Sequence, residues 1–199
     1  MAAIPGAAGG ARQIPSRATG LLLTPGAGGD RNHSTLRAVE QAVTPIPCLR
    51  LDFPNRIAGR KAPDTAPVAI AHVVAAATAF AAELGTTTDH LVLGGRSFGG
   101  RMCSMAVAQG LPVAGLVLLS YPLHPPGAPD KLRTAHFPDL DVPLLFVSGQ
   151  RDPFGSPDEF AAHLSAIPGE VTTVWLPGGH DPRADGPVSA AVADWLHRR

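Results

Sequence analysis

The sequence Leu91-Val92-Leu93-Gly94-Gly95-Arg96-Ser97-Phe98-Gly99-Gly100-Arg101 joins an apolar run typical of a strand to a segment typical of a helix. At the junction lies Gly-x-Ser-x-Gly, the spacing of a nucleophile elbow. The turn is too tight for side chains on either side of the serine, so Gly95 and Gly99 are required sterically. We therefore expect Ser97 to be a nucleophile above the edge of a sheet. The alternative is that Ser97 is an ordinary helix N-cap.

Short apolar runs alternate with helix-like segments on both sides of this elbow. We expect six strands, at residues 20–24, 48–53, 90–93, 114–120, 143–148 and 171–176. Helices are expected at residues 35–42, 68–84, 98–109, 157–167 and 187–197. Such alternation is typical of a parallel sheet with helices on both faces. The connection 121–142 is the one long segment without an obvious helix, and long loops at strand ends often carry function.

The composition favours small-molecule chemistry in a single domain. The chain has 199 residues, 45% of them hydrophobic, which fits one domain with a substantial core. Its 16 basic and 16 acidic residues are interspersed, so neither nucleic acid nor an anionic membrane is an expected partner.

The termini and the cysteines indicate a cytoplasmic protein. Residues 1–17 lack the continuous apolar segment of a secretion signal and are expected to form a flexible tail before a domain at 18–199. No run approaches membrane-spanning length by this interpretation. The two cysteines, Cys48 and Cys103, are expected to be small core residues rather than a disulfide or metal site.

A serine nucleophile needs a general base, and that base needs an acid to orient it. In doubly wound hydrolytic folds these partners follow the serine in the order acid, then histidine, in loops after later strands. Asp152 follows the expected strand 143–148, and His180 follows the last strand. Asp158 and Asp181 are the alternatives for the acid, but Asp158 is expected in a helix and Asp181 adjoins the histidine.

The remaining requirement is an oxyanion hole, formed by two backbone N–H groups. We expect one from Phe98 and one from Ala27, with Gly26 as the second choice, because residues 24–30 form a glycine-rich loop after the first strand. The alternative is a phosphate-binding loop. No Gly-Lys-Ser/Thr follows the glycines, and no third glycine occurs at dinucleotide spacing, so nucleotide binding is disfavoured.

Several longer stretches resemble one known family. They are Pro25-Gly26-Ala27-Gly28, Leu51-Asp52-Phe53-Pro54 leading to Gly59-Arg60-Lys61-Ala62-Pro63-Asp64, the elbow itself, Ser120-Tyr121-Pro122-Leu123-His124-Pro125-Pro126-Gly127 with Lys131-Leu132-Arg133, and Ser148-Gly149-Gln150-Arg151-Asp152-Pro153-Phe154-Gly155, followed by His180. They are similar to small bacterial α/β-hydrolases related to dienelactone hydrolases, a group with a vertebrate testis-expressed member and a subunit of a histone-acetyltransferase complex.

The resemblance implies a minimal three-layer α/β-hydrolase fold without a lid domain. It also implies that Ser97, Asp152 and His180 are nucleophile, acid and base, in agreement with the reading from the residues alone. Candidate substrate-binding residues are Arg96, Tyr121 and His124. We expect a serine hydrolase for a small ester, thioester or lactone, which requires no metal or organic cofactor. The alternatives are an acyltransferase with the same triad and a non-catalytic interaction protein on this scaffold.

Overall fold

The computed structural model describes residues 18–182 and 184–198, and the predicted tail at 1–17 lies outside them. Six parallel strands form one sheet in the order β2-β1-β3-β4-β5-β6. Their bounds are β1 Gly20–Thr24, β2 Cys48–Arg50, β3 Leu91–Arg96, β4 Gly115–Leu119, β5 Leu144–Gly149 and β6 Val171–Leu176. The α-helices are α1 Ser34–Ala42, α2 Pro54–Ile57, α3 Ala66–Glu83, α4 Phe98–Ala108, α5 Pro157–Leu164 and α6 Asp185–His197. Two 3₁₀ turns are η1 Thr88–His90 and η2 Phe137–Asp139.

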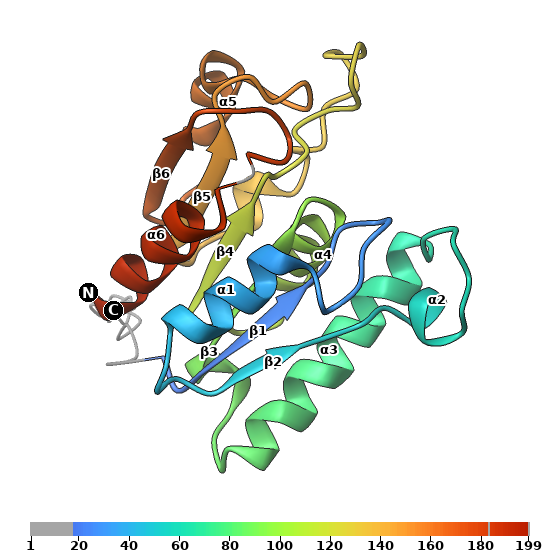
Figure 1. The fold of residues 1–199 in the computed structure, drawn as a ribbon, viewed down its shortest axis with the longest axis vertical. Coiled ribbons are helices and arrows are strands. Elements are labelled where there is room, and N and C mark those ends of the chain that lie inside the picture. Colours follow the sequence, from blue (N-terminus) through green and yellow to red (C-terminus); the bar gives the residue numbers. More distant parts are fainter. Residues whose placement is uncertain (1–17, 183, 199) are drawn as a thin grey trace, which may run out of the picture.

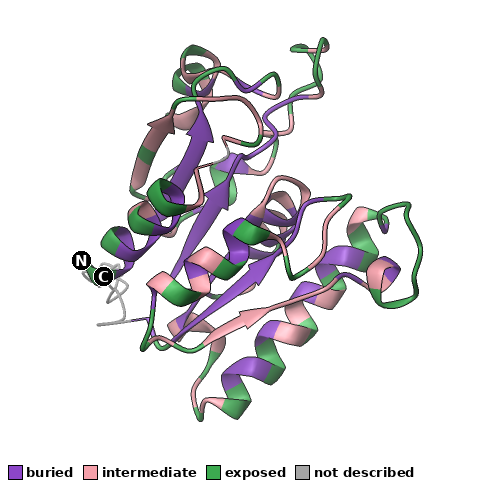
Figure 2. Cartoon of the chain, viewed as in Figure 1, coloured by how far each residue is buried: buried purple, intermediate pink, exposed green. Residues whose placement is uncertain are grey.

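Helices cover both faces of the sheet, as Figure 1 shows, with α1 and α6 on one side and α3 and α4 on the other. Successive strand residues point to opposite faces, so the core divides into two apolar clusters. In β3, Leu91 and Leu93 pack on the side of α3 and α4, whereas Val92 packs on the side of α1 and α6. Figure 2 shows the central strands buried on both faces, while the edge strands β2 and β6 are only partly covered.

The predicted parallel sheet between two helical layers is therefore present, with boundaries that shift by a few residues. The strand expected at 90–93 extends to Arg96, and the strand expected at 48–53 ends at Arg50. The Asp52 carboxylate turns away to accept a hydrogen bond from the Arg31 N–H. Pro54 then begins the short helix α2. The helix expected at 157–167 ends at Leu164.

Helix α3 corrects the expectation that no run approaches membrane-spanning length. It has 18 residues and a mean hydropathy of 1.5, so by length and composition alone it is long enough to cross a membrane. Its apolar character has a simpler cause in the fold, because Ala69, Val73 and Ala77 pack into the core beside the sheet. A core helix meets the same criteria, so α3 is weak evidence for a membrane.

Both cysteines are free, and their surroundings differ. Cys103 is fully buried on α4, as expected, whereas Cys48 on the edge strand β2 is only half-buried. Burial raises the pKa of both thiols to about 12. Neither thiol is therefore ionised at neutral pH, which agrees with the structural role expected for both cysteines.

The connectivity determines where a site can form. After β1 the chain moves outward to β2, and then returns across β1 to form β3 on its other side. In such sheets a crevice opens at the carboxyl ends of the two strands between which the order reverses. The glycine-rich loop after β1 and the elbow after β3 meet at this crevice.

Candidate active site

Ser97 lies between β3 and α4 in a conformation that serine rarely adopts, with φ of 51° and ψ of −116°. The two flanking glycines make this turn possible. A methyl group on Gly95 would lie 2.0 Å from Thr24 Oγ1, and one on Gly99 would lie 2.4 Å from Pro25 O. The steric requirement predicted for both glycines is therefore present, and the atoms that impose it belong to the end of β1.

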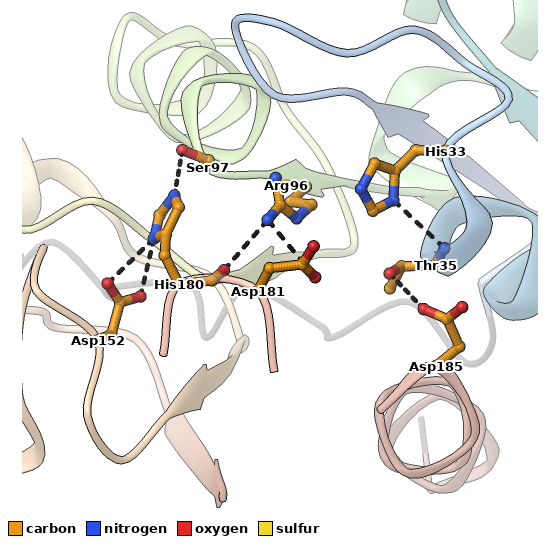
Figure 3. A network of polar contacts seen from close by, with 8 residues as sticks. All are labelled: His33, Thr35, Arg96, Ser97, Asp152, His180, Asp181 and Asp185. Carbon is orange, nitrogen blue, oxygen red and sulfur yellow. Dashed lines mark hydrogen bonds and ion pairs between the residues drawn. The ribbon is translucent and has the colours of Figure 1, made fainter. Parts of the chain in front are cut away.

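The Ser97 side chain is free of the helix that it precedes. Ser97 occupies the N-cap position of α4, but its hydroxyl makes no capping hydrogen bond. Instead, Ser97 Oγ lies 2.8 Å from His180 Nε2 (Figure 3). The interpretation of Ser97 as an ordinary N-cap is thus disfavoured by the position of its hydroxyl.

The imidazole of His180 is held from its other side by Asp152. Both carboxylate oxygens of Asp152 lie close to His180 Nδ1, at 3.0 and 2.9 Å. The Asp152 carboxylate is almost fully buried, at 1% exposure, whereas the His180 side chain is 19% exposed. Because the Asp152 carboxylate accepts a hydrogen bond from Nδ1–H, it favours the tautomer with the proton on Nδ1, which leaves Nε2 as an acceptor towards the Ser97 hydroxyl.

Backbone pairing between two loops brings the acid and the base together. Arg151 N donates to Gly178 O, and Gln150 N donates to Leu176 O, so the loops after β5 and β6 run side by side. The approach is close, since a methyl group on Gly149 would lie 2.2 Å from Gly179 O.

The two other candidate acids are elsewhere. Asp158 lies in the first turn of α5, as expected from the sequence. The Asp181 carboxylate lies 3.7 Å from Arg96 Nη2.

Phe154 is a site residue that the sequence reading did not identify. Its backbone N–H donates to Asp152 Oδ1 over 2.9 Å, and its ring lies against the His180 imidazole with centroids 4.1 Å apart. Phe154 thus contacts both Asp152 and His180. Its place two residues after Asp152 is the only signal in the sequence, because an Asp side chain often bonds the backbone two positions on.

The two segments that carry the predicted oxyanion groups both adjoin Ser97. A methyl group on Gly26 would approach Ser97 Cβ to 3.7 Å, so the loop after β1 borders the nucleophile. Phe98 is the first residue of α4, where backbone N–H groups have no intrahelical acceptor. Ala27 is exposed on the loop next to Gly26.

The three candidate substrate-binding residues all make contacts within the protein. Arg96 Nη2 donates to His180 O over 3.2 Å. Tyr121 is fully buried, and its hydroxyl donates to Arg133 O. His124 is also buried, with its ring nitrogens near Pro125 O and Glu159. These contacts favour a structural role for each of the three residues.

Figure 3 also shows Arg96 beside His180 and Asp181, and a separate set of contacts among His33, Thr35 and Asp185 at the starts of α1 and α6. The Thr35 hydroxyl donates to Asp185 Oδ1 over 2.5 Å, and the Thr35 N–H donates to His33 Nδ1. These bonds join the start of α1 to the start of α6. Among residues 18–182 and 184–198, no cluster of three or more His, Cys, Asp or Glu side chains is arranged to hold a metal ion.

A serine–histidine–aspartate arrangement at the carboxyl edge of a doubly wound parallel sheet is typical of the class of α/β-hydrolase folds. The chain belongs to the alpha/beta hydrolase domain family, whose model matches residues 17–186.

Solved structures share this fold. The RedJ thioesterase of the prodiginine pathway in Streptomyces coelicolor is 20% identical, with a TM-score of 0.66 over 98% of this chain and 91% of its own. Est1E from Butyrivibrio proteoclasticus is 17% identical, with a TM-score of 0.72 over 94% and 90%. A dienelactone hydrolase from Anabaena variabilis is 20% identical, with a TM-score of 0.70 over 93% and 88%. At such identities the similarity establishes the fold.

Proposed function

We propose that this protein is a serine hydrolase that cleaves a small ester, thioester or lactone through an acyl-enzyme intermediate. The observation that carries the proposal is the continuous hydrogen-bonded line from Ser97 Oγ to His180 and on to Asp152. A scaffold without catalytic activity has no need for a strained serine aligned with a base and a buried acid.

In the first half of the reaction, His180 Nε2 accepts the Ser97 hydroxyl proton while Oγ attacks the acyl carbon. Asp152 stabilises the imidazolium that forms. The oxyanion receives hydrogen bonds from the Phe98 and Ala27 N–H groups, at the crevice where these two loops meet. His180 then donates its proton to the leaving group.

In the second half, His180 takes a proton from water as the water oxygen attacks the acyl-enzyme, and it returns that proton to Ser97 Oγ as the acid is released. Neither half-reaction requires a metal or an organic cofactor. The thioesterase and the dienelactone hydrolase among the structural relatives support the substrate range. We place the reaction in the cytoplasm. The relation to the vertebrate and chromatin-complex proteins stays a prediction.

The proposal is tested by labelling with a fluorophosphonate probe, which reacts with activated serines. We expect the native protein to be labelled stoichiometrically, and Ser97→Ala and His180→Ala to lose the label. Ser165→Ala, which removes an exposed serine at the end of α5, serves as the matched control and should label like the native protein. Absence of label on folded native protein would overturn the serine hydrolase proposal.

Hydrolysis is separated from acyl transfer by product analysis with added alcohols. A hydrolase yields mainly the free acid at low alcohol concentration. If instead the alcohol ester predominates at millimolar alcohol, the protein is an acyltransferase that uses the same triad.

A further inference from the structure

Two arginines near the proposed nucleophile have no counter-charge. Across residues 18–182 and 184–198, neither Arg101 nor Arg133 forms a salt bridge, and the buried Nε of Arg101 has no hydrogen-bond partner. Five other arginines pair with carboxylates, namely Arg31, Arg50, Arg56, Arg60 and Arg96. The other described arginines without a salt bridge, Arg37, Arg151 and Arg198, are exposed to solvent. Burying part of a guanidinium without a partner costs free energy, and a bound anion offsets that cost.

Arg101 lies on α4 one turn beyond the nucleophile, since its backbone N–H donates to Ser97 O over 3.1 Å. Arg101 and Ser104 are three residues apart and form one stripe on this helix. Four residues of helix advance about 6 Å along the axis. Long side chains on helices tend to lean towards the N-terminus, which for Arg101 is the direction of the turn that holds Ser97.

The loop 121–142 packs against this stripe and brings Arg133 to it. The Ser104 hydroxyl lies 2.8 Å from His136 Nε2, which fixes one part of the loop on α4. Arg133 is fixed at a second point, because its N–H donates to Leu123 O over 2.8 Å and its carbonyl accepts from the Tyr121 hydroxyl over 2.7 Å. Tyr121 follows the end of β4, next to β3 and the elbow.

The electrostatics agree with this placement. Burial lowers the pKa of Arg133, and the nearby charge of Arg101 lowers it further. Burial, together with Arg101, also lowers the pKa of His136 to about 4, against an opposing effect of Asp139. His136 is therefore neutral at neutral pH, and the positive charge of this cluster comes from the two guanidinium groups.

We propose that Arg101 and Arg133 bind an anionic group of the substrate, a carboxylate or a phosphate, while its acyl carbon lies at Ser97. Guanidinium forks suit both groups because they donate two parallel hydrogen bonds. An anion here also relieves the repulsion between the two arginines. This inference rests on the proposed hydrolase function and narrows its substrates to those with a negative charge a few bonds from the scissile carbonyl.

The test compares two esters with the same six-carbon acyl chain, mono-4-nitrophenyl adipate and 4-nitrophenyl hexanoate. We expect kcat/KM of the native protein to favour the adipate ester by tenfold or more, after correction for the spontaneous rates. The substitutions Arg133→Gln and Arg101→Gln should each bring the ratio of the two kcat/KM values, adipate ester over hexanoate ester, close to one. Arg37→Gln is the matched control, since it removes an exposed arginine from α1 on the opposite face and should keep the native ratio.

Competition tells the two anions apart. Inhibition of hexanoate cleavage by free adipate indicates a carboxylate subsite, whereas stronger inhibition by inorganic phosphate indicates a phosphate subsite. A native ratio near one, or an unchanged ratio in Arg133→Gln, would overturn the subsite and leave the hydrolase proposal standing.

Failure of the hydrolase proposal gives a different pattern, in which neither ester reacts and the fluorophosphonate does not label. The subsite is then judged by calorimetric titration with adipate and with phosphate. Saturable binding that Arg133→Gln abolishes supports it, and absence of binding to the native protein overturns it. Arg133 is only half-buried, so this variant is expected to fold even where Arg101→Gln does not.

Discussion

Ser97 has a positive φ because the tight turn between β3 and α4 requires it, and not because serine favours this backbone conformation. Non-glycine residues in this region cost of order 1–3 kcal/mol and cluster at functional sites. Here the strain has a visible effect, since the turn directs the hydroxyl away from α4 and towards His180. Ser120, at the end of the neighbouring strand β4, also has a positive φ, of 48°. Both unusual conformations occur at the carboxyl edge of the sheet.

His136 makes stability depend on pH in a defined window. Its pKa is about 4 in the folded protein and about 6.5 in the unfolded chain, so the unfolded chain binds the proton first. The contribution to the free energy of unfolding is therefore fully present above pH 6.5 and is lost as the pH falls towards 4. Discounted for partial exposure, we expect a loss of roughly 1–2 kcal/mol.

Urea unfolding of the native protein and of His136→Gln at pH 7 and pH 4.5 measures this effect. Glutamine cannot take up the proton but keeps a polar group near Ser104. The native protein should lose more stability between the two pH values than the variant does. Equal losses in the two proteins would show that His136 titrates normally.

At the scale of elements, the close contact between the elbow and the end of β1 holds the site together. A methyl group on Gly99 would meet Pro25 O and Thr24 Oγ1 at 2.4 Å, so Gly99→Ala must push α4 away from β1. We expect the free energy of unfolding to fall by about 2 kcal/mol. Fluorophosphonate labelling should also slow at least tenfold, because the Phe98 N–H moves with the helix.

Gly186→Ala is the control for this prediction. Gly186 lies in the first turn of α6, with no atom within 4 Å of an added methyl group. Its replacement should leave labelling unchanged and keep or slightly raise stability. Chemical denaturation and labelling rates of both variants decide the matter. If Gly99→Ala labels like the native protein, the elbow does not need the close contact.

The order and type of the main elements could be predicted because each is a separate apolar run with its own turn signals. The short elements could not. Helix α2, which begins at Pro54, is one turn long and is therefore too short to show a periodic pattern of apolar residues. The end of β2 depends on Asp52 binding Arg31, a contact 21 positions away that no local pattern contains.

The same division holds for the site. Ser97, Asp152 and His180 could be proposed because each follows a strand, and parallel strands bring such loops to one edge. The contacts of Arg96 and Phe154 could not be predicted in this way. Arg96 reaches a carbonyl 84 positions along the chain, and Phe154 packs on a ring that is distant in sequence. Contacts of this kind depend on the side-chain geometry of the folded molecule.

At the scale of the whole molecule, the site combines residues that follow two strands which are not neighbours in the sheet. The proposed nucleophile, Ser97, follows β3, whereas the proposed base, His180, follows β6, with β4 and β5 between them. Arg96 spans this separation, since Nη2 donates to the His180 carbonyl and lies 3.7 Å from Asp181. Its side chain is only 16% exposed. We therefore infer that Arg96 is a positioning residue for the base.

Arg96→Met removes this bond and keeps the apolar part of the side chain. We expect kcat for a neutral ester to fall roughly tenfold with little change in KM, because a misplaced base slows proton transfer without altering substrate binding. Arg96→Lys should recover part of kcat, since an ammonium still donates to the carbonyl. Steady-state kinetics of both variants, with unfolding curves to check stability, provide the measurement. A rise in KM at constant kcat would instead place Arg96 in contact with the substrate.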